Sequence, residues 1–249
     1  MLRIFLVALM LLTASSIPAF ADVVKEPPVP QPPVTKVNVL PPHEHTEDCE
    51  ATAAEPVQIV CILDRSGSMR ALAGDTIGGY NSFLDKQRQE PGEAEVTTVL
   101  FDDKYELIGA GVPLKEAPEL TAATYYARGT TALLDAVGRT IAETAGRMAQ
   151  EGICPAKRSV LFLIMTDGLE NASHEYDKAT VKAMIESVTQ EYGWKFVFMG
   201  ANIDSVAEAS SIGISAQNAV NYTHDRKGVA DAFASMESAA REVREEARQ

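Results

Sequence analysis

Short apolar runs alternate with helical patterns along the chain after Pro56. The apolar runs are nearly continuous, which is typical of strands that are buried on both faces of a parallel sheet. We expect strands at residues 57–63, 96–101, 105–110, 160–166 and 195–199, and a short one near Val220. We expect helices at residues 77–89, 133–149, 180–192, 205–211 and 228–244.

The turn between the second and third predicted strands, FDDKY, is too short for a crossover connection. These two strands are therefore expected to form a hairpin, with the third strand antiparallel at the sheet edge. Trp194 opens the fifth strand and is expected to pack, although an interface role is the alternative. The apolar helix residues that recur at helical spacing are expected in the core: Leu84, Val137, Ile141, Met184, Ile185 and Val188.

The first 21 residues have the pattern of a secretory signal peptide. Arg3 precedes an apolar run from Ile4 to Leu12, and Ala19-Phe20-Ala21 offers a cleavage site. The run is shorter than the roughly 20 residues that cross a bilayer, so a retained membrane anchor is the less favoured alternative. The pattern predicts a protein that is secreted or periplasmic, with no stable membrane span after cleavage.

Residues 22–55 are expected to be a Pro-rich, acidic linker that precedes a folded domain at residues 56–249. Seven prolines stand between Glu26 and Pro42, a composition that favours an extended polyproline II spacer. The following HEHTEDCE contains His43, His45 and Cys49, which could bind a divalent metal. A solvated acidic tether explains the same stretch.

Composition and charge exclude several classes of protein. Hydrophobic residues make up 46% and charged residues 23% of the chain, which is ordinary globular usage rather than that of a disordered or fibrous chain. There are 35 Asp and Glu against 22 Lys and Arg, a formal net charge of -13. Because nucleic-acid binding depends on a basic surface, no nucleic-acid partner is expected.

Polar residues follow two of the predicted strands and precede one predicted helix, all at the same edge of the sheet. They are DRSGSM at 64–69, RGTTA at 128–132 and TDG at 166–168. Ligands of open parallel sheets collect beyond the carboxyl ends of the strands. Hydroxyl and carboxylate oxygens suit Mg²⁺, Mn²⁺ or Ca²⁺, and these loops have no His or Cys for Zn²⁺ or Cu²⁺. The sequence therefore predicts a site for a hard cation.

In this site the hydroxyls of Ser66 and Ser68 would face inward, with Gly67 permitting the tight path of the backbone. Asp64 and Asp167 would reach the ion through water and balance its charge. An open coordination position would then attract a carboxylate. For the first segment alone, a capped loop start is the alternative, because Ser and Asp favour such positions for backbone hydrogen bonds.

The segments DRSGS, GTTALLDA and TDG, in this order, resemble the von Willebrand factor type A domain, and the resemblance spans about residues 56–244. From Met199 onward the chain is also similar to bacterial exported single-domain members. The resemblance implies an α/β fold: a Rossmann-like three-layer sandwich, with a mostly parallel central sheet, one antiparallel edge strand and helices on both faces.

The resemblance also implies a metal-ion-dependent adhesion site. Residues matching Asp64, Ser66, Ser68, a middle-loop threonine and Asp167 hold Mg²⁺ there, and an Asp or Glu of a partner protein completes the coordination. The family's middle loop usually reads GGT, whereas this chain has GTT. Counting back from Asp135 identifies Thr131 as the ligand, with Thr130 as the alternative.

Competing functions lack their motifs. Ser66 stands where a haloacid dehalogenase-type phosphatase needs a second aspartate, and no serine lies in GxSxG. His174 and His224 lie in polar segments and are expected to be ordinary surface residues. Glycines do not form GxGxxG after the first strand. We expect a non-enzymatic, metal-dependent adhesion or assembly module, with a structural domain stiffened by its metal, or a metal-dependent hydrolase, as alternatives.

Partner choice is expected to depend on residues around the predicted ion. These mix apolar, aromatic and charged groups, as binding surfaces do. The predicted rim comprises Met69, Arg70, Tyr126, Arg128, Leu169, Glu170 and Asn171.

Three cysteines in an exported protein leave one unpaired if two form a bridge. Cys61 lies in a buried strand and is expected to be a small core residue. In the sheet order that the resemblance implies, the first and fourth strands are parallel neighbours. Cys49 and Cys154, which precede these strands, then lie beneath the same sheet edge and could form a disulfide, provided that their Cα atoms approach within about 7 Å.

Overall fold

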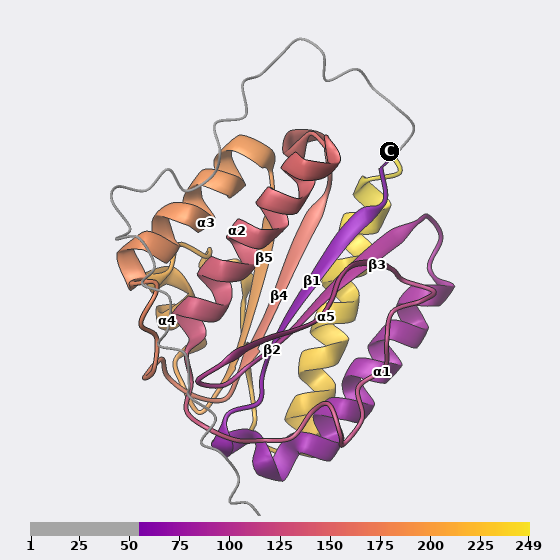
Figure 1. The fold of residues 1–249 in the computed structure, drawn as a ribbon. Helices are drawn as coiled ribbons and strands as arrows, with labels where there is room; N and C mark the ends of the chain where they lie inside the picture. The colour runs from indigo at the N-terminus through magenta and orange to yellow at the C-terminus, as the bar shows by residue number, and fades with distance from the viewer. Residues whose placement is uncertain (1–54) are drawn as a thin grey trace, which may run out of the picture. The chain divides into compact units, whose positions relative to one another are not determined.

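The structure, a computed structural model, describes residues 55–249, which form a six-stranded sheet with helices on both faces (Figure 1). The predicted signal peptide and nearly all of the predicted linker, including His43, His45 and Cys49, lie outside the described residues. The strands are β1 (Val57–Asp64), β2 (Ala94–Phe101), β3 (Tyr105–Pro113), β4 (Val160–Thr166), β5 (Lys195–Ala201) and β6 (Ala219–Tyr222). The α-helices are α1 (Ala73–Gln89), α2 (Leu133–Glu151), α3 (Lys178–Tyr192), α4 (Ser205–Ser211) and α5 (Arg226–Glu246).

The strand order is β3-β2-β1-β4-β5-β6, and every pair is parallel except β2 and β3. The predicted hairpin and its antiparallel edge strand are therefore confirmed. Strand β3 runs to Pro113 rather than to residue 110, with register shifts in its pairing with β2. Gly111 in this irregular stretch has φ 57, a backbone conformation that glycine adopts without strain.

Alternate residues of β1 point to opposite faces of the sheet, and each set belongs to a separate core. Ile59, Cys61 and Leu63 pack with side chains of α1 and α5. Val60 and Ile62 pack with side chains of α2, α3 and α4. Figure 1 shows the same division, with α1 and α5 on one face and α2, α3 and α4 on the other. The predicted three-layer arrangement is thus confirmed.

Trp194 is fully buried, as expected for a packing residue. Its ring centroid lies 5.7 Å from that of Phe162, and its Nε1 donates a hydrogen bond of 3.2 Å to the carbonyl of Pro155. Burial of a tryptophan is favourable when its single polar atom finds such an acceptor. None of the described helices is both long and apolar enough to cross a bilayer.

The local differences from the sequence expectation lie at element ends. Helix α1 begins at Ala73, before the predicted residue 77, because a short 3-10 helix, η1 (Gly67–Leu72), leads directly into it. Two further 3-10 helices, η2 (Pro155–Lys157) and η3 (Ala216–Asn218), precede β4 and β6. Helix η1 also turns the side chain of Met69, a predicted surface residue, into the core.

Candidate metal centre

Three loops meet at the carboxyl edge of the sheet. They follow β1, precede α2 and follow β4. Backbone hydrogen bonds join them: the Gly67 N–H donates to the Gly129 carbonyl at 3.1 Å, and the Asn171 N–H donates to the Thr131 carbonyl at 3.0 Å. A Cβ at Gly67 would lie 3.3 Å from the Gly129 carbonyl oxygen, so only a glycine fits this approach comfortably.

A continuous series of contacts joins four predicted ligands across two of these loops. The Ser66 N–H donates to Oδ1 of Asp64 at 2.6 Å, and the hydroxyls of Ser66 and Ser68 lie 3.0 Å apart. The Ser68 hydroxyl donates to Oδ1 of Asp167 at 2.6 Å. Asp64, Ser66 and Asp167 are buried, whereas Ser68 is exposed. The cluster therefore has a buried floor and one side open to solvent.

Thr131 and Thr130 differ sharply in their surroundings. Thr131 is buried, and its Oγ1 would lie 3.8 Å from a Cβ placed on Gly168, the residue after Asp167. Thr130 is exposed. The hydroxyl of Thr131 thus faces the loop that carries Asp167.

The carboxyl group of Asp64 has an unusual electrostatic environment. Burial raises its pKa to about 6, and the nearby charge of Asp167 adds to this effect. Hydrogen bonds from Ser66 and from the Thr166 hydroxyl, which donates to Oδ2 at 2.6 Å, act in the opposite direction. The cluster therefore combines two carboxyl groups with neutral hydroxyls and contains no cationic side chain of Lys or Arg.

This donor set fits a hard divalent cation. All of its side-chain donors are oxygens, the type that Mg²⁺, Mn²⁺ and Ca²⁺ prefer. Within residues 55–249, no group of three or more His, Cys, Asp or Glu side chains is arranged to hold a metal ion. A metal site in this part of the chain would therefore depend on the hydroxyl oxygens.

The predicted rim is only partly a surface. Tyr126 is 44% exposed and Leu169 is 58% exposed, and Arg70 is also exposed. Met69 is fully buried and packs in the core beneath α1 and α5, so the prediction that it lies on the rim is wrong. Helix η1 turns its side chain inward, and no periodicity in so short a segment could have indicated this.

Two other predicted rim residues support the loops with their side chains. Oε2 of Glu170 accepts a hydrogen bond of 2.9 Å from the Leu134 N–H in the first turn of α2. Oδ1 of Asn171 accepts one of 2.9 Å from the Thr131 N–H. Glu170 and Asn171 therefore help to fix the loop that carries Thr131 through these two oxygens.

A buried ion network that the sequence did not indicate lies beside the centre. Arg65 is fully buried, and its Nε donates to Oδ2 of Asp102 at 3.1 Å. Arg128, another predicted rim residue, donates to the same oxygen from its Nε at 2.6 Å, and Arg65 also pairs with Glu106 at 2.5 Å. Both guanidinium groups lie over the ring of Tyr126, 5.5 and 5.1 Å from its centroid. These contacts hold the middle loop against the β2–β3 hairpin.

His224 is another residue of the site that the sequence did not indicate. Its Nε2 lies 2.8 Å from Oδ2 of Asp167, so the expectation of an ordinary surface residue is wrong for His224. His174 is exposed, as expected. No local pattern could have indicated the contact, because His224 and Asp167 are 57 residues apart in the chain.

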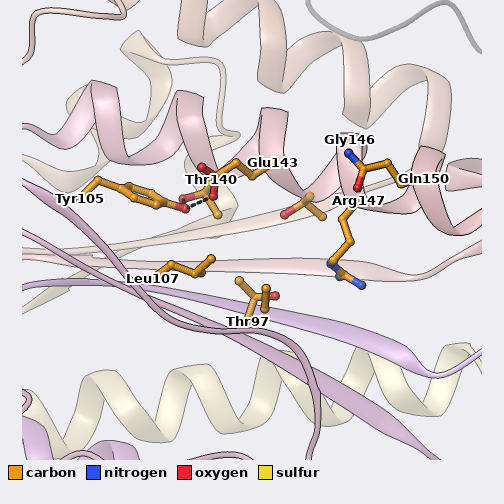
Figure 2. A pocket seen from close by; sticks show the side chains of 10 residues that line it. Thr97, Tyr105, Leu107, Thr140, Glu143, Gly146, Arg147 and Gln150 are labelled. Atoms are coloured by element: carbon orange, nitrogen blue, oxygen red, sulfur yellow. Dashed lines mark hydrogen bonds between the residues drawn. The ribbon is translucent and has the colours of Figure 1, made fainter. Parts of the chain in front are cut away.

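A cavity of about 340 Å³ lies elsewhere, between β3 and the second half of α2 (Figure 2). Tyr105 lies at one end, where its hydroxyl donates to Glu143 at 2.9 Å, and Arg147 lies at the other end. Arg147 donates to Gln58 and to Glu151. The charged side chains that line this cavity thus pair with neighbouring side chains. The cavity is separate from the candidate metal centre, since none of the predicted ligands lines it.

The sequence matches no family model, and a comparison with curated proteins finds no match. Solved structures do resemble the fold. The von Willebrand factor domain of the type V pili tip protein Mfa5 from Porphyromonas gingivalis has a TM-score of 0.52 at 11% identity, covering 76% of this chain and 96% of that chain. Manganese-loaded TRAP protein from Plasmodium vivax has a TM-score of 0.51 at 16% identity, covering 73% of each chain.

Proximal thread matrix protein 1 from the mussel byssus has a TM-score of 0.52 at 12% identity, covering 72% of this chain and 46% of that chain. This chain thus spans less than half the length of the mussel protein. At such identities the likeness is one of fold, and the function has to be argued from the residues of the site.

Proposed function

We propose that this chain, whose fold is that of von Willebrand factor type A domains, is an exported module that binds another protein through a divalent cation. The observation that carries the proposal is the unbroken series of contacts from Asp64 through Ser66 and Ser68 to Asp167. It joins hard oxygen donors from two strand ends, with the buried Thr131 beside them. The motif order DRSGS, GTTALLDA and TDG supports the same assignment.

In this proposal the hydroxyls of Ser66, Ser68 and Thr131 hold Mg²⁺ or, alternatively, Mn²⁺ or Ca²⁺. Asp64 and Asp167 balance its charge through water. The bound cation would supply a Lewis acid with an open position for a carboxylate. Manganese in the fold neighbour TRAP supports a divalent cation of this kind.

The partner is proposed to be a protein that presents an Asp or Glu side chain. Ser68 is exposed, so the open side of the cluster faces solvent. Tyr126 and Leu169, two of the most exposed large apolar side chains of the described residues, lie on loops that flank the cluster. Apolar and aromatic groups around a polar centre are typical of protein-binding surfaces. Mfa5, a pilus tip protein with this fold, is consistent with such a role.

We further propose that the module has no catalytic turnover. A serine hydrolase with a serine–histidine pair would need its imidazole within reach of the nucleophilic hydroxyl. Here the Ser68 hydroxyl donates to Asp167, and His224 contacts the other oxygen of the same carboxylate. The carboxylate therefore stands between serine and histidine, which does not place the imidazole to receive the serine proton.

The N-terminal pattern supports the remaining parts of the proposal. Residues 1–21 would direct export to a secreted or periplasmic location, residues 22–55 would form the linker, and residues 56–249 would form the binding domain. The alternative function is a structural domain whose cation only stiffens the loops at the carboxyl edge.

One experiment separates these functions. The purified protein is used to capture partners from its native extracellular or periplasmic milieu with Mg²⁺, and again with a chelator. We expect a captured protein that is lost with the chelator and with Asp64→Ala, but is retained with Asp231→Asn, which alters an exposed aspartate of α5. Substitution of the partner's exposed acids should abolish binding. Metal binding without any metal-dependent partner would favour the structural domain.

A further inference from the structure

We infer that His224 is a positioning residue of the cation centre, which holds the Asp167 carboxylate in the orientation that the centre needs. The inference rests on the proposed function, because it assigns a role at the same site. It adds a residue outside the three loops that carry the predicted ligands, since His224 lies between β6 and α5.

The two oxygens of Asp167 have different partners. Oδ1 accepts from the Ser68 hydroxyl at 2.6 Å, and Oδ2 lies 2.8 Å from Nε2 of His224. The Asp167 side chain is fully buried and that of His224 is 25% exposed. Because a carboxylate can only accept at this contact, the imidazole nitrogen is the donor. With both oxygens engaged, rotation of the carboxylate is restrained, and Oδ1 stays directed at Ser68.

The loop that carries His224 is built to hold the imidazole in this place. At its start, the Tyr222 hydroxyl donates to the Thr166 carbonyl at 3.1 Å, which ties β6 to the end of β4. At its end, the Asp225 side chain accepts from the Gly228 N–H at 2.7 Å and caps α5. A Cβ on Gly228 would collide with the backbone of Thr223. Both flanks of His224 are therefore fixed.

Hydrogen bonds of this kind matter for metal affinity. Removal of a partner that fixes the orientation of a metal-ligating group typically changes metal affinity by about 10- to 100-fold. The imidazole makes its contact on the oxygen that faces away from the serines, so it acts through Asp167. His224 is thus the link between the cation centre and the start of the C-terminal helix.

The test uses two substitutions that separate hydrogen bonding from packing, in the full chain. His224→Phe keeps the ring volume and removes the donor, whereas His224→Gln offers an amide donor of similar reach. Mn²⁺ binding is measured by calorimetry and by the electron paramagnetic resonance of the free ion. We expect His224→Phe to weaken Mn²⁺ binding about tenfold or more, and His224→Gln to remain near the wild type. His174→Phe, at an exposed histidine, should leave binding unchanged.

A second variant moves the imidazole without altering it. Gly228→Ala should displace the loop and weaken Mn²⁺ binding in the same direction as His224→Phe, and circular dichroism checks that the variant is folded. Equal losses for His224→Phe and His224→Gln, or no loss for either, would overturn the inference. Nitrogen coupling in the pulsed electron paramagnetic resonance spectrum of bound Mn²⁺ would show a directly coordinated imidazole, and it would also overturn the inference. Wild-type protein that binds no Mn²⁺ would instead overturn the proposed centre itself.

Discussion

The hydroxyl of Ser68 lies 2.6 Å from Oδ1 of Asp167, although the two residues are 99 positions apart in the chain. The parallel pairing of β1 with β4 brings them together, because both strands end at the same edge of the sheet. The loop after β1 then carries two serines, and the loop after β4 carries the aspartate. The order of the strands thus determines which of the strand-end motifs share the proposed centre.

The two middle-loop threonines provide a matched pair for testing the ligand set. We predict that Thr131→Ala reduces Mg²⁺ or Mn²⁺ affinity by at least about tenfold, because it removes a buried hydroxyl beside the Asp167 loop. Thr130→Ala, at an exposed neighbour, should leave the affinity unchanged. Calorimetric titration of both variants measures the difference. The reverse order of effects would make Thr130 the ligand.

Removal of Asp102 is predicted to destabilise the fold. Asp102→Ala would leave the fully buried Arg65 without its buried partner, and loss of one member of a buried ion pair costs about 3 kcal/mol or more. Lys86→Ala breaks the exposed Lys86–Glu237 pair and should cost less than about 1 kcal/mol. Urea unfolding measures both free energies. Similar values for the two variants would show that the Arg65 network contributes little to stability.

Alanine substitutions at two adjacent glycines of α1 should change the free energy of unfolding in opposite directions. At Gly78 a Cβ meets no atom within 4 Å, so Gly78→Ala should stabilise the helix by about 0.5 to 1 kcal/mol. At Gly79 a Cβ would collide with the ring of Phe233 in α5, and Gly79→Ala should destabilise by about 1 to 3 kcal/mol. The free energies of unfolding in denaturant test the pair. A stabilising Gly79→Ala would mean that α1 and α5 pack more loosely than described.

The cysteine prediction concerns one bridge and one buried thiol. We predict that Cys49 and Cys154 form a disulfide and that Cys61 stays reduced. Cys61 is fully buried in β1, and burial raises the pKa of its thiol to about 12, so the native protein should not react there with thiol reagents. Titration of the exported, denatured and unreduced protein should detect one thiol. Three thiols would exclude the bridge.

Much of the fold follows from hydrophobic patterning. The bounds of β4 and α4 are as predicted, because a continuous apolar run and a short amphipathic segment are each flanked by clear breaks. The end of β3 could not be predicted, since its sequence includes Gly109 and Gly111 and none of its residues is fully buried. Glycines and exposed positions weaken the pattern on which such a prediction depends.

The candidate centre, like the fold, could be predicted from the sequence only in part. Its principal side chains follow strands and form a motif, so their meeting at one edge was predictable. Met69 was misplaced because the short 3-10 helix η1 sets the direction of its side chain. Arg65 and His224 were missed because their partners, Asp102 and Asp167, come from distant segments. A buried arginine after a strand gives no signal of its partner until the sheet is assembled.

Calorimetric titration of the purified full chain with Mg²⁺ directly tests whether the residues at the carboxyl edge of the sheet bind a divalent cation. We expect one binding site in the wild type, its loss in Asp64→Ala and in Asp167→Ala, and its retention in Asp231→Asn. Asp64 ends β1 and Asp167 follows β4, and both side chains are buried, so circular dichroism checks that each site variant is folded. Absence of Mg²⁺ binding in the wild type would contradict the proposed cation site. So would an affinity in both site variants that equals that of the wild type.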